Sequence, residues 1–84
     1  MFDSKKFEVA EVVATCATSL IEFVETINDE QGFELEVGQG LSVVKFVLTC
    51  TGDEYIHEIK DHLQSYSDYE LRMFNIQRMV VAED

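Results

Sequence analysis

Proline and tryptophan are absent from this chain of 84 residues, and basic residues are scarce. Six Lys and Arg stand against seventeen Asp and Glu, which gives a formal net charge of −11 and a pI near 4.3. Such a charge opposes binding to nucleic acid and to anionic lipid, because their phosphates would be repelled. It favours approach to positively charged surfaces instead. We therefore expect a basic protein as the partner, and contact with neither nucleic acid nor membrane.

Cysteine is also scarce, and long apolar runs are missing. Cys16 and Cys50 lie far apart, each within an apolar run, which is typical of small buried hydrophobic residues and not of a secreted disulfide framework. The longest apolar stretch, residues 41–50, contains Lys45 and is too short to cross a bilayer. No apolar segment of a signal peptide follows the first six residues. These features predict a cytoplasmic protein.

Motifs that carry chemistry are missing as well. His57 and His62 are five residues apart on an expected helix, so they point in different directions, and neither has a cysteine at zinc-site spacing. The sequence has no calcium-binding loop and no nucleophile motif of the type G-x-S-x-G. The glycines of residues 38–40 are too few to cradle a phosphate. We expect no enzymatic activity, no metal and no cofactor.

The hydrophobic pattern predicts a single small α+β domain over residues 1–84. Residues 4–30 are expected to form one long amphipathic helix, with Asp3 as its N-cap and Gly32 as its C-terminal stop. The expected helix rests on apolar residues that recur at alternating steps of four and three. These are Val9, Val13, Cys16, Leu20, Phe23 and Ile27.

The rest of the chain predicts a sheet with a second helix. Residues 33–37 alternate with period two and residues 41–50 are strongly apolar, so we expect two strands joined as a hairpin. Residues 53–66 have helical spacing, preceded by a capping box of Thr51 and Glu54. Residues 69–82 predict a long strand, and a helix remains open as the alternative. The expected order is αββαβ, a three-stranded sheet with both helices packed on one face.

Acidic residues gather in the middle of the chain. Between residues 22 and 36 there are six acids and no base. Three of them, Glu22, Glu25 and Asp29, rise along one side of a helix at steps of about 4.5 and 6 Å, near the spacing of charges on a nucleic-acid strand. Tyrosines beside acids are typical interface anchors. The candidate partner-binding residues are Glu22, Glu25, Asp29, Glu30, Glu34, Glu36, Asp53, Glu54, Glu58, Tyr55 and Tyr69.

These features favour a non-enzymatic inhibitor that blocks the basic, nucleic-acid-binding surface of a partner. In character, though not in motif, the chain resembles the small acidic proteins of phages that act as nucleic-acid mimics, such as anti-CRISPR or anti-restriction proteins. That resemblance implies the cytoplasm of a host cell as the site of action.

A homodimer with a structural or assembly role is an alternative. Residues Ala10, Ala14, Ala17 and Ile21 form a shoulder beside the apolar stripe of the expected N-terminal helix. With the shoulder included, the apolar arc is wider than a helix on one core requires. The dimer would form through this shoulder or through the open face of the sheet.

A further alternative comes from residues 18–25 and 29–33, which resemble the Asp-Ser-Leu helix of acyl carrier proteins. The resemblance implies that Ser19 is an attachment site for phosphopantetheine. Thr18 stands where that family has aspartate, and residues 41–50 are strand-like where the family is helical.

Overall fold

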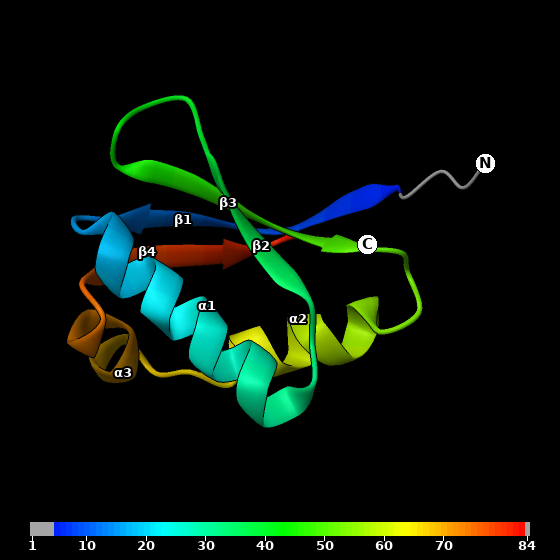
Figure 1. Cartoon of the computed structure of the whole chain (residues 1–84). Coiled ribbons are helices and arrows are strands. Elements are labelled where there is room, and N and C mark those ends of the chain that lie inside the picture. Colours follow the sequence, from blue (N-terminus) through cyan, green and yellow to red (C-terminus); the bar gives the residue numbers. More distant parts are fainter. Residues whose placement is uncertain (1–4, 84) are drawn as a thin grey trace.

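The computed structural model describes residues 5–83 and is built around a four-stranded antiparallel sheet in the order β2-β3-β1-β4 (Figure 1). The strands are β1 (Lys6–Ala14), β2 (Leu35–Gln39), β3 (Lys45–Thr51) and β4 (Ile76–Val81). The helices are α1 (Ala17–Gln31), α2 (Ile56–Gln64) and α3 (Asp68–Met73). Strand order and connections correspond to the split βαβ topology of ferredoxin-like domains. The α+β class is confirmed, but the sheet has four strands where three were expected.

The additional strand is β1, which occupies the first half of the expected N-terminal helix. Val9 is a bulge between the pairs Glu8–Thr49 and Ala10–Leu48, and both Val9 and Ala10 are buried. The extra residue breaks the period-two alternation and leaves apolar residues at spacings that imitate a helix. β-branched side chains such as Val9 favour the strand. The prediction of one helix over residues 4–30 is therefore wrong, and its N-cap Asp3 lies outside the described residues.

Helix α1 retains the second half of that prediction. It buries Leu20, Phe23, Val24 and Ile27 against the sheet. It ends at Gly32, which adopts the left-handed conformation (φ 73°) and donates its N–H to the Asn28 carbonyl at 2.8 Å. The predicted stop at Gly32 is thus confirmed. The shoulder is not, because Ala10 and Ala14 are buried in β1 and do not share a helix with Ala17 and Ile21.

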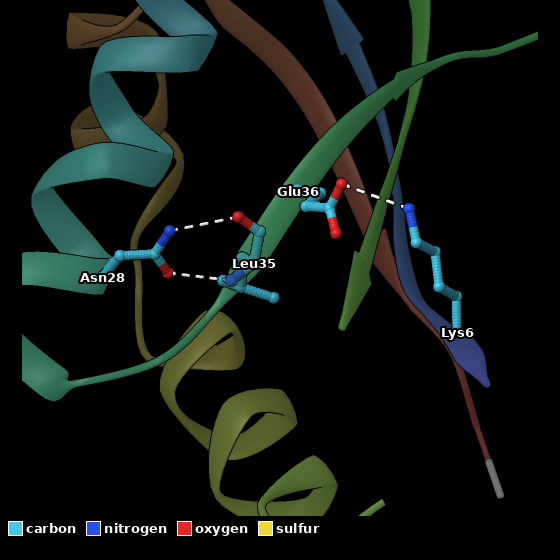
Figure 2. A network of polar contacts seen from close by, with 4 residues as sticks. All are labelled: Lys6, Asn28, Leu35 and Glu36. Carbon is cyan, nitrogen blue, oxygen red and sulfur yellow. Dashed lines mark hydrogen bonds and ion pairs between the residues drawn. The ribbon is translucent and has the colours of Figure 1, made fainter. Parts of the chain in front are cut away.

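Asn28 also joins α1 to the start of β2 (Figure 2). Its side-chain Nδ2 donates to the carbonyl of Leu35 at 3.0 Å, and its Oδ1 accepts the N–H of Leu35 at 3.0 Å. The amide therefore pairs with the backbone of Leu35 as a neighbouring strand would. This pair sets where the chain enters the sheet after the turn at Gly32.

The hairpin of β2 and β3 is confirmed, with Leu35 paired to Cys50 and Gln39 paired to Phe46. Strand β3 begins at Lys45, later than expected, because residues 40–44 form the connecting loop. Gly40 is required at the start of this loop, since a Cβ there would lie 2.8 Å from the carbonyl oxygen of Lys45. In Figure 1 the loop rises on the side of the sheet away from the helices.

The C-terminal part contains two helices and a strand. Helix α2 begins after Tyr55, and no side chain caps it, so the capping box expected from Thr51 and Glu54 does not form. A capping box does form at α3, between Ser67 and Glu70. Residues 69–82 therefore combine both alternatives: the end of a short helix and then β4. The two segments join at Asn75, whose positive φ of 62° turns the chain into the sheet.

The helices cover one face of the sheet, as expected, and the core lies between the two layers (Figure 1). The ring of Phe23 is central to it, with centroids 5.0 Å from Tyr66 and 5.1 Å from Phe74. Among the described residues, no helix or strand covers the other face of the sheet (Figure 1). Within residues 5–83, no helix is long and apolar enough to span a bilayer.

Candidate functional site

Helix α1 presents acids to solvent because its buried residues, Leu20, Phe23, Val24 and Ile27, lie on the opposite side of the helix, toward the sheet. Glu22, Glu25, Asp29 and Glu30 are exposed on it. Asp29 and Glu30 lie in its last turn, where the helix dipole is already negative and Lys or Arg would be locally more stable. The first turn has no acid, and the last turn has no base. The charge pattern of α1 therefore runs against local helix stability.

The other helices extend this acidic surface. We call residues 17–34 and 53–75 the helix layer, since they form α1, α2, α3 and their connections on one side of the sheet (Figure 1). Its bases are Lys60, which is only 8% exposed, and Arg72. Its acids are Glu22, Glu25, Asp29, Glu30, Glu34, Asp53, Glu54, Glu58, Asp61, Asp68 and Glu70.

Glu36 does not belong to this surface. Its neighbour Leu35 faces the core, so Glu36 points to the opposite side of the sheet, where it forms an ion pair of 3.2 Å with Lys6 (Figure 2). Glu8 and Glu11 lie on that same face, because Glu8 is paired with Thr49, as Glu36 is, and Glu11 is paired with Val47 two residues along β3. The acids of residues 8–36 are therefore divided between the two faces of the molecule.

A cleft of about 280 Å³ lies between the connection from α1 to β2 and the connection from β3 to α2. Its apolar lining comes from Phe33 and Ile59. Glu34, Glu54 and Tyr55 also line it, which brings together three of the residues expected to bind a partner. A lysine or arginine side chain suits such a cleft, because its stem is apolar and its head is cationic.

Tyr69 lies apart from this cleft. It is exposed on α3, and Figure 1 shows α3 at the opposite end of the helix layer from the connection between β3 and α2. The two expected anchors, Tyr55 and Tyr69, therefore do not act on one small contact. Tyr66 is instead part of the core, where burial raises the pKa of its phenol and its hydroxyl lies 3.0 Å from Nε2 of His62.

The two cysteines have different surroundings. Hydrogen bonds from the hydroxyl and the backbone N–H of Ser19 lower the pKa of the Cys16 thiol at the start of α1. Burial raises the pKa of the Cys50 thiol in β3. Both are free thiols. Among residues 5–83, no three His, Cys, Asp or Glu side chains are placed to hold a metal ion.

Ser19 lies in the first turn of α1, since that helix begins at Ala17. Its hydroxyl accepts a hydrogen bond of 2.9 Å from Nδ2 of Asn75. The surrounding sheet differs from the helical fold that the carrier-protein resemblance implies: Lys45–Thr51 is a strand. Attachment of phosphopantetheine stays a prediction, which the intact mass after exposure to a transferase would test.

Sequence reasoning did not identify the cleft or the burial of Lys60. The cleft joins residues that are about twenty positions apart, which the pairing of Leu35 with Cys50 in the hairpin of β2 and β3 brings together. A signal for Lys60 exists, because it is next to the buried Ile59 and three residues before the buried Leu63.

The chain matches no protein-family model, no characterised protein and no solved structure.

Proposed function

We propose that this protein is a non-enzymatic inhibitor whose helix layer occupies a basic, nucleic-acid-binding surface of a partner protein. The observation that supports this most directly is the partition of charge. The helix layer holds eleven acids against Lys60 and Arg72, while the opposite face of the sheet holds Glu8, Glu11 and Glu36 against Lys6, Lys45 and Arg78. Nearly all of the net charge therefore belongs to one side of the fold.

The arrangement of α1 supports imitation of a nucleic-acid strand. Helix α1 is 15 residues long, and its buried residues from Leu20 to Ile27 hold it on the sheet. It therefore carries Glu22, Glu25 and Asp29 in fixed positions. Their steps of about 4.5 and 6 Å along the axis match the several-ångström spacing of phosphates. Rigid, pre-placed charges lose little conformational entropy on binding, which favours occlusion of a groove lined by Lys and Arg.

The cleft beside α2 supplies a second kind of contact. A Lys or Arg of the partner would place its stem against Phe33 and Ile59 and its charge between Glu34 and Glu54. Tyr55, which is exposed at the rim, would cover the inserted side chain. This contact is directional, whereas the row of acids on α1 acts mainly by attraction at a distance.

The experiment begins with capture of partners from the native cell, with nuclease present so that bridging nucleic acid is destroyed. The test is then competition: the captured protein should release a labelled nucleic acid as this chain is titrated in. Changing Glu22, Glu25 and Asp29 together to Lys moves the net charge from −11 to −5, because each change adds two charges. We expect this triple variant to lose competition by at least tenfold.

A matched control carries the same change in net charge elsewhere. Glu8, Glu36 and Glu83 lie outside the helix layer, and their joint change to Lys also gives −5. The control variant should compete nearly as well as the parent. Equal losses in the two variants would mean that net charge and not the helix layer acts, and the proposal would then fail. It would also fail if the partner bound nucleic acid normally at saturating inhibitor.

A further inference from the structure

The face of the sheet opposite the helices has a regular pattern of charge and apolar residues. In the register of β3, β1 and β4, Val13 lies between Lys45 and Arg78. In the neighbouring row on the same face, two residues along each strand, Glu11 lies between Val47 and Val80. One row therefore reads base, valine, base, and the other reads valine, acid, valine. We call these six residues the open face.

Apolar side chains are exposed on and beside the open face. Val80 is 47% exposed, and in the loop of residues 40–44 Leu41 and Val43 are 99% and 86% exposed. The open face and Leu41 line one concave region of about 620 Å³. Large exposed apolar side chains next to a concave surface mark interaction sites.

We infer that the open face binds a second copy of this chain, so that two sheets pack face to face in a symmetric dimer. The electrostatics select this occupant. The open face and its surroundings balance Lys6, Lys45 and Arg78 against three acids, in a chain whose net charge is −11. Two copies would repel each other through their helix layers, so this is the side on which they approach without strong repulsion.

The two rows also complement each other. A two-fold axis that crosses the strands midway between the rows places each row over the other row of the second copy. Each Glu11 then lies over Val13 of the second copy, with that copy's Lys45 and Arg78 on either side. The valines Val47 and Val80 meet the stems of the same two basic residues. One arrangement thus satisfies the charges and covers the apolar residues.

The area suggests a dimer of modest affinity. Strands lie about 4.8 Å apart and rise about 3.3 Å per residue, so a four-stranded face about six residues long projects to roughly 400 Å². The loop with Leu41 and Val43 adds to this area, and the total stays below the ~800 Å² per partner of a standard interface. The helix layers would point outward on opposite sides of the dimer, leaving both free for a basic partner.

The oligomeric state tests this inference, by sedimentation equilibrium from about 1 to 500 µM in 0.3 M NaCl, which screens the mutual repulsion. We expect a concentration-dependent dimer of the 9.6 kDa chain. Val47→Asp and Leu41→Asp should each raise the dissociation constant at least tenfold. Ile21→Asp is the matched control: Ile21 is 45% exposed on α1, and its change should alter the constant less than twofold.

A charge exchange tests the arrangement itself. Glu11→Lys alone should abolish the dimer, whereas Glu11→Lys combined with Lys45→Glu and Arg78→Glu restores complementary rows and should restore it. A monomer at every concentration overturns the inference and leaves the face to another partner. A dimer that survives Val47→Asp and Leu41→Asp, or one lost with Ile21→Asp, also overturns it. These outcomes do not depend on the competition assay, so the two proposals can fail separately.

Discussion

The side-chain amide of Asn28 is expected to contribute more to stability than any other polar group near the surface of α1. Asn28→Ala removes both hydrogen bonds to the backbone of Leu35, each of which contributes about 1 kcal/mol to the free energy of unfolding. Alanine returns about 0.5 kcal/mol through its higher helix propensity. The backbone N–H and carbonyl of Leu35 remain beside a buried side chain without full access to water. We expect a net loss of about 2 kcal/mol.

Asn28→Asp separates the donor from the acceptor. The carboxylate can still accept the N–H of Leu35, but it cannot donate to the carbonyl at neutral pH. It also adds a negative charge beside Asp29 and Glu30 at the negative end of the helix dipole, at a cost of about 0.3–1 kcal/mol. The near-isosteric change should therefore destabilise the fold at least as much as Asn28→Ala.

Urea unfolding followed by circular dichroism at 222 nm measures these losses. The midpoint should fall while the slope stays constant, and a loss of 2 kcal/mol should lower Tm by about 8–16 °C in a domain of this size. Thr26→Ala is the control: the Thr26 hydroxyl donates to the Glu22 carbonyl on the exposed side of the same helix, and alanine there should be neutral or slightly stabilising. If Asn28→Asp were as stable as the parent, the donor role of Asn28 would be refuted.

Three further predictions concern other parts of the fold. Phe23→Ala should lower the free energy of unfolding by about 3–5 kcal/mol, because it empties the centre of the core between Tyr66 and Phe74; a loss below 1 kcal/mol in urea unfolding would contradict this packing. Hydrogen bonds from the backbone and hydroxyl of Ser67 lower the pKa of Glu70, so this stabilisation is present above the ordinary carboxyl pKa and is lost as pH falls through the lowered value. The difference in stability between the parent and Glu70→Gln should therefore shrink from pH 7 to pH 3, and a constant difference would exclude the ionic contribution. Iodoacetamide at pH 7.5 should label Cys16 well before Cys50, and Ser19→Ala should slow the labelling of Cys16; equal rates at the two thiols in mass spectra would contradict their opposite pKa shifts.

How far the sequence predicted the fold depended on how regular each segment is. The hairpin of β2 and β3 followed from the alternation of residues 33–37 and the apolar run of residues 41–50, and α1 from Leu20 onward followed from its apolar stripe. Strand β1 was missed because the bulge at Val9 interrupts the period-two alternation of apolar and polar residues that identifies a strand. Helix α3 was missed because six residues give too short a pattern, although Ser67 and Glu70 carry the capping box that marks its start.

The candidate site was predicted in part for the same reasons. Glu22, Glu25 and Asp29 lie on the outer side of α1 as expected, because that half of the helix was right. Glu36 was grouped with the acids of α1 because it follows them closely in sequence. The structure places it on the other face of the sheet, since its neighbour Leu35 faces the core under the helices. Whether the predicted residues bind a partner stays a prediction.

The position of β1 at the centre of the sheet has a consequence for how the chain folds. β1 is synthesised first, yet its two neighbours are β3 and β4, from the middle and the far end of the described chain. Pairings so distant in sequence slow folding, because a long loop must close before each contact forms. During translation β1 has no strand beside it until residue 45 has emerged from the ribosome. We therefore expect folding to finish only after synthesis of β4, on a timescale of milliseconds or longer.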